Sequence, residues 1–332
     1  MRKVAIIGGD GIGPEVISSA VDVLRYVGAD LEMVSADMGQ GSYRRKGAYL
    51  PQGTVDLLKE CDAGLFGAIT SPTTYDPSYR SPLLQLRREF DLYANVRPVK
   101  RLHPSIGLVD LDVLIVRENT EGMYTGSERE VPGGVITERK VSDAACRRIV
   151  DKAIELCRAE GRGSITCVHK SNVLRRSDGM FREIFYERVK DSGLQGRDLL
   201  VDAAAAALVL QPRSQECFVT LNLYGDILSD EAAALVGGLG FAPSGNIGEG
   251  FALFEPTHGS APDIAGKGIA NPIAAILSGA MMLRYLGMSS KAQKIEAAIP
   301  AALGQGIRTP DAGGKLRTTE FTRGYLEVLS TF

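Results

Sequence analysis

Short apolar runs that end abruptly in polar residues recur along the chain. Five segments of three or four mostly apolar residues show this pattern, at positions 4–7, 113–116, 165–168, 199–201 and 218–221. Runs of this length are typical of buried parallel strands, and helical stretches separate them. The alternation of strands and helices predicts an α/β fold.

Polar or charged residues follow each run. In chain order they include Asp10, Arg117, Lys170, Asp202 and Asp226. Ligands of open α/β sheets bind outside the carboxyl ends of the strands, although polar residues also follow strands in ordinary loops. Their recurrence after five runs predicts a ligand site at these strand ends.

Residues 122–142 interrupt this alternation. Two extended stretches surround Pro132, Gly133 and Gly134, which together predict a turn. A protruding hairpin leaves an exposed strand edge, and proteins usually pair or cover such an edge. We expect either an arm that pairs with a second subunit or a plain surface hairpin.

An acid pair, Asp226 and Asp230, lies in a segment predicted to be helical over 226–239. Two acids four residues apart share a helical face and repel each other by a few tenths of a kcal/mol. The predicted apolar stripe of this helix, on another face, comprises Leu228, Ala232, Leu235 and Leu239. One interpretation is a solvated acidic face. The other is a Mg²⁺ or Mn²⁺ site completed by a further carboxylate such as Asp202.

Composition narrows the classes of function. The 332 residues suggest about two domains, and 38 basic against 40 acidic residues give a net charge of −2. This balance predicts neither nucleic-acid nor membrane-surface binding. The apolar run before Gly8 is too short for a signal peptide, and no segment approaches the roughly 18 apolar residues of a spanning helix. Five dispersed cysteines indicate reduced thiols in a cytoplasmic protein.

Two glycine-rich segments are candidates for nucleotide binding. The opening GGDGIGPEV fails the G-x-G-x-x-G pattern because Pro14 occupies the last glycine position, yet a glycine turn before a helix can approach an anion. In the second segment, 254–272, Asp263 could accept hydrogen bonds from a ribose diol and would repel a 2′-phosphate. A turn-rich loop of this composition also needs no ligand.

Arginines are the candidates for carboxylate binding. Arg87, Arg97 and Arg117 would suit a substrate with two or three carboxylates, because a guanidinium group can bind a carboxylate with two hydrogen bonds. Lys170 is a candidate for acid–base work, since burial or nearby charges lower the pKa of a lysine. His169, beside it, is interpreted as a structural, hydrogen-bonded residue.

Seven motifs resemble those of the β-decarboxylating dehydrogenases, which oxidise isocitrate, 3-isopropylmalate, homoisocitrate and related 2-hydroxy acids. In family order they are GGDGIGPEV, FDLYANVRP, VRENTEGMYTG, HKSNVLRRSDGMF, NLYGDILSDEAA, GGLGFAPSGNIG and HGSAPDIAGKGIANP. The resemblance implies a two-domain α/β fold of the isopropylmalate-dehydrogenase type. Residues 1–98 and 240–332 would form a discontinuous NAD-binding domain. Residues 99–239 would form the domain for metal, substrate and dimer contacts, with 122–142 as the clasping arm.

The resemblance also implies site roles. The residues expected to bind the malate carboxylates are Arg87, Arg97 and Arg117. Asp226 and Asp230 would hold Mg²⁺ or Mn²⁺ with Asp202 of the partner subunit, and that cation would relieve their repulsion. Tyr124 would transfer protons together with Lys170, which comes from the partner subunit. Asp202 is also expected to be catalytic. The protein would thus be a homodimer with shared sites, or a tetramer of such dimers.

The cofactor implied by the resemblance is NAD. Asp263 and Ile264 occupy the positions that recognise the adenosine ribose in NAD-dependent members, whereas NADP-dependent relatives typically carry Lys-Tyr there. Asn172 of the partner subunit would lie near the nicotinamide, and Asn271 near the adenine. The other residues expected to contribute to the cofactor site are Ile12, Glu255, His258, Gly259, Ser260 and Ala261.

The distinguishing group of the substrate is expected to meet the residues just before Arg87. Leu83 and Leu84 would accommodate an isopropyl group, whereas Arg80 and Ser81 could bind a distal carboxylate. Isocitrate-specific members commonly have Ser-x-Asn here, and Leu83 replaces that asparagine. The segment TSPTTYDPSYRSPLLQLRR is most similar to homoisocitrate dehydrogenases, so homoisocitrate is the expected substrate. The alternatives are 3-isopropylmalate and relaxed specificity that includes isocitrate.

Two other classes of protein are less consistent with the sequence. A non-catalytic regulatory subunit of the family usually lacks part of the tyrosine, lysine and aspartate set, which is complete here. An unrelated α/β binding protein does not account for an ordered match along the whole chain.

Overall fold

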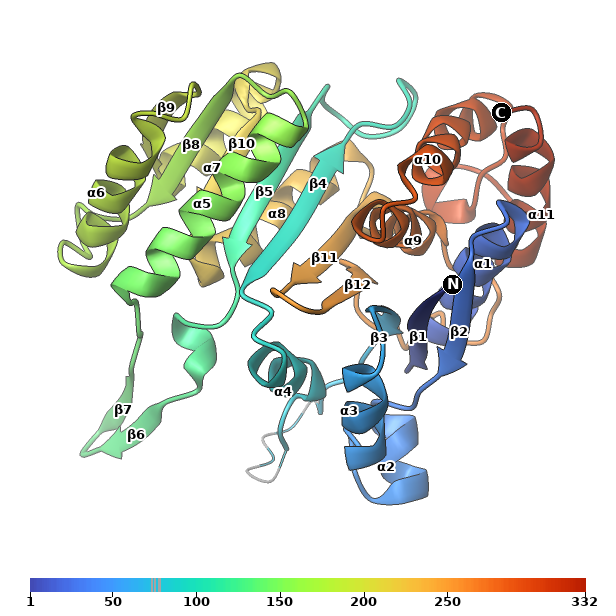
Figure 1. Ribbon diagram of the computed structural model, residues 1–332, viewed down its shortest axis with the longest axis horizontal. Coiled ribbons are helices and arrows are strands. Elements are labelled where there is room, and N and C mark those ends of the chain that lie inside the picture. Colours follow the sequence, from blue (N-terminus) through green and yellow to red (C-terminus); the bar gives the residue numbers. More distant parts are fainter. Residues whose placement is uncertain (73, 75, 77–78) are drawn as a thin grey trace.

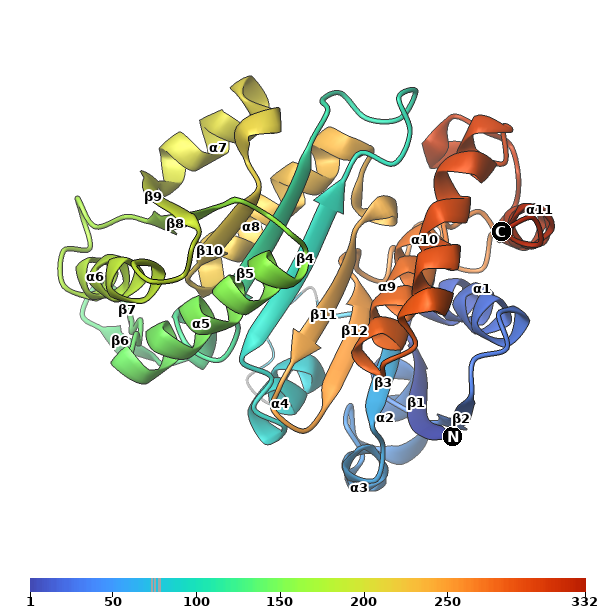
Figure 2. The same cartoon turned by 45° about the horizontal axis from the view of Figure 1, so that its top comes forward.

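The computed structural model describes residues 1–72, 74, 76 and 79–332. The described residues form a ten-stranded sheet with helices on both faces, and a two-stranded hairpin that projects from it (Figures 1 and 2). The strands are β1 (Arg2–Gly9), β2 (Leu31–Ser35), β3 (Ala63–Ala68), β4 (Ala94–Lys100), β5 (Asp112–Glu118), β6 (Glu128–Val131), β7 (Gly134–Thr137), β8 (Ser164–His169), β9 (Gln195–Leu200), β10 (Cys217–Thr220), β11 (Pro243–Ile247) and β12 (Ala252–Pro256). The helices are α1 (Gly13–Tyr26), α2 (Gln40–Lys46), α3 (Gln52–Lys59), α4 (Pro82–Glu89), α5 (Asp143–Ala159), α6 (Ser177–Val189), α7 (Val201–Leu210), α8 (Asn222–Val236), α9 (Ile273–Tyr285), α10 (Ser289–Gly304) and α11 (Thr318–Leu329).

The main sheet is mixed, with the order β2-β1-β3-β12-β11-β4-β5-β10-β8-β9. β11 pairs antiparallel with β12 and with β4, and β4 pairs antiparallel with β5. The remaining pairs are parallel. All five predicted strands are present, although Val201 already belongs to α7. The expectation that these strands are all parallel is wrong for β1, because the antiparallel pairs in the middle reverse the strand direction.

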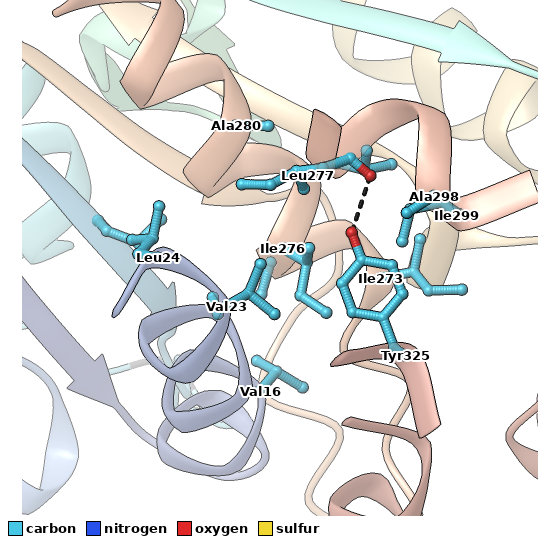
Figure 3. Packing of buried hydrophobic residues seen from close by; sticks show 14 of the residues in the cluster. Val16, Val23, Leu24, Ile273, Ile276, Leu277, Ala280, Ala298, Ile299 and Tyr325 are labelled. Carbon is cyan, nitrogen blue, oxygen red and sulfur yellow. Dashed lines mark hydrogen bonds between the residues drawn. The ribbon is translucent and has the colours of Figure 1, made fainter. Parts of the chain in front are cut away.

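The largest hydrophobic core packs α1, α9, α10 and α11 against β1, β3 and β12. Figure 3 shows Val23 of α1, Ile276 of α9 and Ile299 of α10 meeting beside Tyr325 of α11. The Tyr325 ring is fully buried, and its hydroxyl donates to the Ile295 carbonyl oxygen at 2.8 Å. Burial of this apolar surface fixes the helices on the half of the sheet that carries the amino terminus.

A second core lies under α5 at the other half of the sheet (Figure 1). Ser142 caps this helix, because its hydroxyl accepts a hydrogen bond from the Ala145 amide at 3.3 Å. The residues that α5 buries recur at three- and four-residue spacing, and they include Cys146, Ile149, Val150, Ala153, Ile154 and Cys157. All five cysteines of the chain are buried and unpaired, as predicted.

The predicted hairpin is confirmed. β6 and β7 pair antiparallel between Glu128 and Thr137, apart from the main sheet. Two apolar side chains of this hairpin face solvent, with Val135 61% and Ile136 40% exposed. Within the described part of the chain, no helix has the length and hydropathy needed to cross a membrane.

The helix with the acid pair is shifted relative to the prediction of 226–239. α8 begins at Asn222 and ends at Val236, where Gly237 adopts a φ of +131° that other residues rarely tolerate. Leu239 therefore lies in a separate 3₁₀ turn and outside the helical stripe. Leu228 and Ala232 are buried as predicted, which directs the acids away from the core.

The core in Figure 3 gives a test of the tertiary packing. Tyr325→Phe is expected to lower the free energy of unfolding by about 1 kcal/mol, because the buried hydroxyl loses its bond to the Ile295 carbonyl. Urea denaturation followed by circular dichroism measures this difference. Tyr26→Phe is the matched control, since Tyr26 is 50% exposed. Equal midpoints for the two variants would contradict the assignment.

Candidate active site

A cleft of about 380 Å³ opens where α4, α8 and the strands β3, β4, β5 and β12 approach one another. Most residues predicted to bind substrate line it. The predicted site residues found there are Ser81, Leu83, Leu84, Arg87, Arg97, Arg117, Tyr124, Asp226, Glu255, His258 and Gly259. Positions 73, 75, 77 and 78 of the predicted specificity segment lie outside the described residues.

The register of the sheet explains why the arginines meet. Asn246 of β11 pairs with Asn95 of β4, which pairs in turn with Arg117 of β5. Side chains on directly paired positions point to the same face, and Arg97 shares it because it lies two residues after Asn95. A polar row thus crosses three neighbouring strands.

Each arginine is buried, and neutral side chains accept most of the hydrogen bonds of Arg87 and Arg97. Arg87 donates through Nε to Asn246 Oδ1 at 3.1 Å, and its Nη2 lies 3.7 Å from Glu255 Oε1. Arg97 donates through Nε to Asn95 Oδ1 at 2.6 Å and through Nη1 to Ser229 Oγ at 2.6 Å. These bonds orient the guanidinium groups, and the carboxylates of Asp226 and Asp230 lie 3.5 and 3.4 Å from Arg97.

Arg117, at the end of β5, contacts the start of α8. Its Nε and Nη2 donate to Asn222 Oδ1 at 3.0 and 2.7 Å, and its Nη1 donates to Asp226. The helix can come this close because Gly225 has no side chain. A Cβ at Gly225 would lie 2.7 Å from the Arg117 Cβ.

The electrostatics of the cleft favour an anionic ligand. Burial lowers the pKa of Arg87 to about 10, and the positive charge of Arg117 adds to that effect. Burial and Arg117 lower the pKa of Arg97 in the same way. Both shifts report guanidinium groups that are removed from solvent and close to another cation, so a bound carboxylate would stabilise their charged form.

Arginines also relieve the repulsion within the acid pair. Burial raises the pKa of Asp226, but Arg117 and Arg97 outweigh it and bring the net pKa below its usual value. Asp230 is more peripheral. Its Oδ1 lies 3.4 Å from Arg97 Nη1, and burial keeps its pKa raised despite that contact.

Asp226 and Asp230, two carboxylates on one helix, are candidates for part of a metal site. Hard oxygen donors of this kind suit Mg²⁺ or Mn²⁺. Within the described ranges, no group of three or more His, Cys, Asp or Glu side chains could hold a metal ion. Asp226 and Asp230 therefore fit a cation only if further donors come from the substrate, water or another subunit.

Tyr124 is placed to donate a proton. Its hydroxyl donates to Asp226, and the Arg117 guanidinium lies 5.0 Å from the ring centre. Burial and the bond to Asp226 raise the pKa of Tyr124, so the phenol stays protonated at neutral pH.

Lys170 and Asp202 lie elsewhere in the same chain. They contact each other at the end of β8 and the start of α7, and the lining of the cleft includes neither. The Asp202 side chain is 63% exposed, and Asn172 is also exposed. His169 is buried and bonded to Asp198 at 2.9 Å, which agrees with its structural interpretation.

The glycine-rich loop after β12 packs on the turn after β1. The Ile12 amide donates to the Ser260 carbonyl at 2.9 Å, and a Cβ at Gly11 would lie 1.9 Å from that oxygen. Buried His258 Nε2 has no hydrogen-bond partner among the described residues, which leaves a polar atom for a ligand at the edge of the cleft. Burial lowers the pKa of His258, so its ring is neutral at pH 7.

Four other predicted cofactor residues, Ala261, Asp263, Ile264 and Asn271, lie in this loop between β12 and α9. Asp263 is exposed, Ile264 and Ala261 pack partly against the main core, and Asn271 is buried with its Nδ2 donating to Asp311 at 3.0 Å. Arg80 lies outside the cleft lining, and its Nη1 donates to the Tyr79 carbonyl at 2.9 Å. Ser81 uses its hydroxyl to cap α4 at the Leu84 amide.

Sequence reasoning missed the residues that orient the arginines. They are Asn95, Asn222, Ser229 and Asn246. All four lie in or beside quoted motifs, so a search for polar residues inside apolar segments would have found them. The roles of Asn95 and Asn246 depend on strand register, and those of Asn222 and Ser229 depend on how α8 packs on the sheet, which one sequence does not specify.

Comparison with known proteins identifies the family. The family model described as isocitrate/isopropylmalate dehydrogenase matches residues 3–324. The chain belongs to this family. It is similar to 3-isopropylmalate dehydrogenase of Methanothermobacter thermautotrophicus, with 48% identity over 96% of this chain and 95% of that protein. It is 47% identical to isocitrate/homoisocitrate dehydrogenase of Thermus thermophilus, over 99% of both chains.

A solved structure supports the same conclusion. Isocitrate dehydrogenase from Methylococcus capsulatus superposes with a TM-score of 0.95, at 37% identity and over 99% of both chains. The predicted family, fold class and reaction class are confirmed, so the protein is an oxidatively decarboxylating dehydrogenase. Members of the isocitrate/isopropylmalate dehydrogenase family use NAD or NADP with a divalent metal and act on small hydroxy acids.

The polar row gives a test of the site's architecture. Asn246→Ala is expected to destabilise the protein by about 3 kcal/mol, since buried Arg87 and Glu255 both lose a partner. It is also expected to raise KM for the hydroxy acid about tenfold through the loosened Arg87. Chemical denaturation and steady-state kinetics measure the two effects.

Gln52→Ala is the control for Asn246→Ala, because its amide bonds only on the exposed surface of α3. It is expected to leave stability within about 0.5 kcal/mol of wild type. A wild-type KM in Asn246→Ala would show that this amide does not hold Arg87 in its binding position.

Proposed function

We propose that the protein oxidises homoisocitrate with NAD⁺ and releases CO₂ to give 2-oxoadipate. The observation that carries this proposal is the convergence of three buried arginines with Tyr124 and Asp226 on one cleft. Three guanidinium groups match a substrate with several carboxylates better than they match a neutral or cationic one.

Ser81 and the nearby Arg80 support the choice of homoisocitrate. Ser81 lines the cleft at the start of α4, and Arg80 precedes it on the exposed side. Homoisocitrate has a longer chain with a terminal carboxylate, which could reach a guanidinium group at the rim. The similarity to a Thermus isocitrate/homoisocitrate dehydrogenase supports the same choice.

3-Isopropylmalate is the second candidate, and a specific observation favours it. Leu83 and Leu84 line the cleft and would contact an isopropyl group. The Methanothermobacter relative carries that substrate in its name. One apolar group in such a pocket changes binding by about 1–3 kcal/mol, so the two candidates are separable by kinetics.

Asp226 and Asp230 would hold Mg²⁺ or Mn²⁺ with Asp202 of the partner subunit. When bound, the cation would act as a Lewis acid toward the hydroxyl and carboxylate oxygens of the substrate. Arg87, Arg97 and Arg117 would bind the carboxylates and orient the reacting carbon. Tyr124, kept neutral by its surroundings, would donate a proton to the carbon that loses CO₂.

A base, helped by Lys170 of the partner subunit, would remove the proton of the substrate hydroxyl, and Asp202 would also be catalytic. In each chain these two residues contact each other, and apolar side chains are exposed on α7 and α8. Leu210 is 77% exposed and Ile227 is 58% exposed. We infer that this surface and the β6–β7 arm form a homodimer interface, since exposed apolar side chains of this kind mark subunit contacts.

The cofactor would bind between the loops after β1, β3 and β12. These loops would belong to the NAD-binding domain formed by residues 1–98 and 240–332. Asp263 would accept hydrogen bonds from the ribose diol of NAD and repel the 2′-phosphate of NADP. The unpartnered His258 Nε2 supports a ligand beside that loop. Asn172 of the partner subunit would lie near the nicotinamide of NAD, and Asn271 would lie near its adenine.

Steady-state kinetics with homoisocitrate, 3-isopropylmalate and isocitrate test the substrate and cofactor. Each acid is assayed with NAD⁺ and with NADP⁺ at fixed Mg²⁺, and EDTA-treated enzyme is the metal control. We expect kcat/KM to favour homoisocitrate and NAD⁺ by about tenfold or more, which corresponds to about 1.4 kcal/mol. A tenfold preference for isopropylmalate would instead mean that Leu83 and Leu84 determine the substrate specificity of the pocket.

Mixed dimers test the shared site. Lys170→Ala and Asp226→Asn are each expected to lose most, but not all, of their activity alone while retaining the fold. Co-expression would place an intact site in each heterodimer, because Lys170 of one subunit completes the site that keeps Asp226. With random pairing, about a quarter of wild-type activity should return. Heterodimers as inactive as the parents would show that each site uses its own Lys170.

A further inference from the structure

Asp178 is a fully buried carboxylate in the first turn of α6, and it is not part of the cleft. Each of its oxygens accepts two hydrogen bonds. Oδ1 accepts from Arg139 Nη1 at 2.6 Å and from Ser177 Oγ at 3.2 Å. Oδ2 accepts from the Lys170 amide at 2.7 Å and from the Tyr224 hydroxyl at 3.0 Å.

These donors come from three parts of the fold that the proposed chemistry uses. Arg139 lies at the base of the arm, between β7 and α5. Lys170 is the first residue after β8, and Tyr224 lies on α8, two residues before Asp226. The Arg139 guanidinium also lies 5.3 Å from the centre of the Tyr224 ring. Asp178 therefore joins the arm, the lysine and the acid-bearing helix.

The contact with the Lys170 amide has a consequence for its ammonium group. A lysine side chain is long and flexible, so the ammonium group is placed accurately only if both ends of the side chain are restrained. The tip of Lys170 contacts Asp202, and its backbone is held by Asp178. Next to it, the Ser171 amide donates to His169 Nδ1 at 3.1 Å. The direction of the side chain is thus set by the turn that Asp178 stabilises.

A purely structural role gives a weaker account of this carboxylate. Replacement of a buried ion pair by apolar residues is often neutral or stabilising, because burial of charge carries a large desolvation penalty. A charge that bonds four donors in one arrangement restricts the geometry of the turn more than apolar packing does. The placement of these donors around Lys170 connects that restriction to the reaction.

We propose that Asp178 is a positioning residue for Lys170, an inference that rests on the acid–base role proposed above for that lysine. Asp178 holds the turn after β8 against α8 and the base of the arm, so that Lys170 is presented in one direction. Loss of the carboxylate displaces the lysine and slows the proton transfer. Binding of substrate and cofactor, which depends on other residues, changes little.

A double-mutant cycle tests this inference. Asp178→Asn, Lys170→Ala and the double variant are compared with wild type for kcat and for both KM values, using the best substrate of the kinetic panel. Asp178→Asn alone is expected to lower kcat about tenfold or more, with each KM within about twofold of wild type. In the Lys170→Ala background the same substitution is expected to change kcat less than about twofold.

The cycle separates positioning from structural damage. If Asp178→Asn lowers kcat by the same factor with and without Lys170, or raises KM as much as it lowers kcat, the inference is overturned. Full activity of Lys170→Ala alone would instead overturn the proposed function. The two failures are therefore distinguishable.

Two further variants keep the test decisive. Glu216→Gln is the matched control, because Glu216 accepts from the amides of Gly163 and Ser164 at the opposite end of β8. It is expected to leave kcat within about twofold. If Asp178→Asn does not fold, Arg139→Gln takes its place in the cycle, since it removes the cation bound to Asp178 while leaving the buried carboxylate. Additive effects of Arg139→Gln and Lys170→Ala would equally overturn the inference.

Discussion

The structure around the cleft depends on how three buried positive charges are held in place. Arg87, Arg97 and Arg117 are almost removed from solvent, where a guanidinium group is stable only with hydrogen-bond partners for its donors. The partners are mainly amide and hydroxyl oxygens of the polar row and of α8. Neutral acceptors orient the arginines, and the carboxylates of Glu255, Asp226 and Asp230 lie beside them.

The acid pair on α8 follows from the same balance. Asp226 contacts Arg117 and Tyr124, and Asp230 lies near Arg97. Nearby cations offset the repulsion between the two carboxylates even before a metal binds. A divalent cation would add to this compensation. The carboxylates, the arginines and the neutral tyrosine thus form one coupled electrostatic unit, and a change in any member alters the others.

The mixed topology of the sheet brings distant segments to this unit. β11 and β4 reverse the strand direction, so the loops after β3 and β12 belong to strands that run opposite to β5 and β10. Neighbouring strands are also rotated by roughly 20 to 25° relative to each other. Residues from both sets of strands, and from the segments that follow them, line one cleft. The same topology leaves Lys170 and Asp202 outside it, where Asp178 anchors the lysine.

The sequence by itself determined the elements and the chemistry. Most strands and helices follow from the local pattern of apolar residues. The family motifs name Arg87, Tyr124 and Asp226 as site residues without coordinates. Only the tertiary structure decided which side chains meet. The row of Asn246, Asn95 and Arg117 depends on strand register, and the contacts of Asp178 join residues up to 46 positions apart. Such pairings arise from packing between remote segments, which local sequence patterns do not encode.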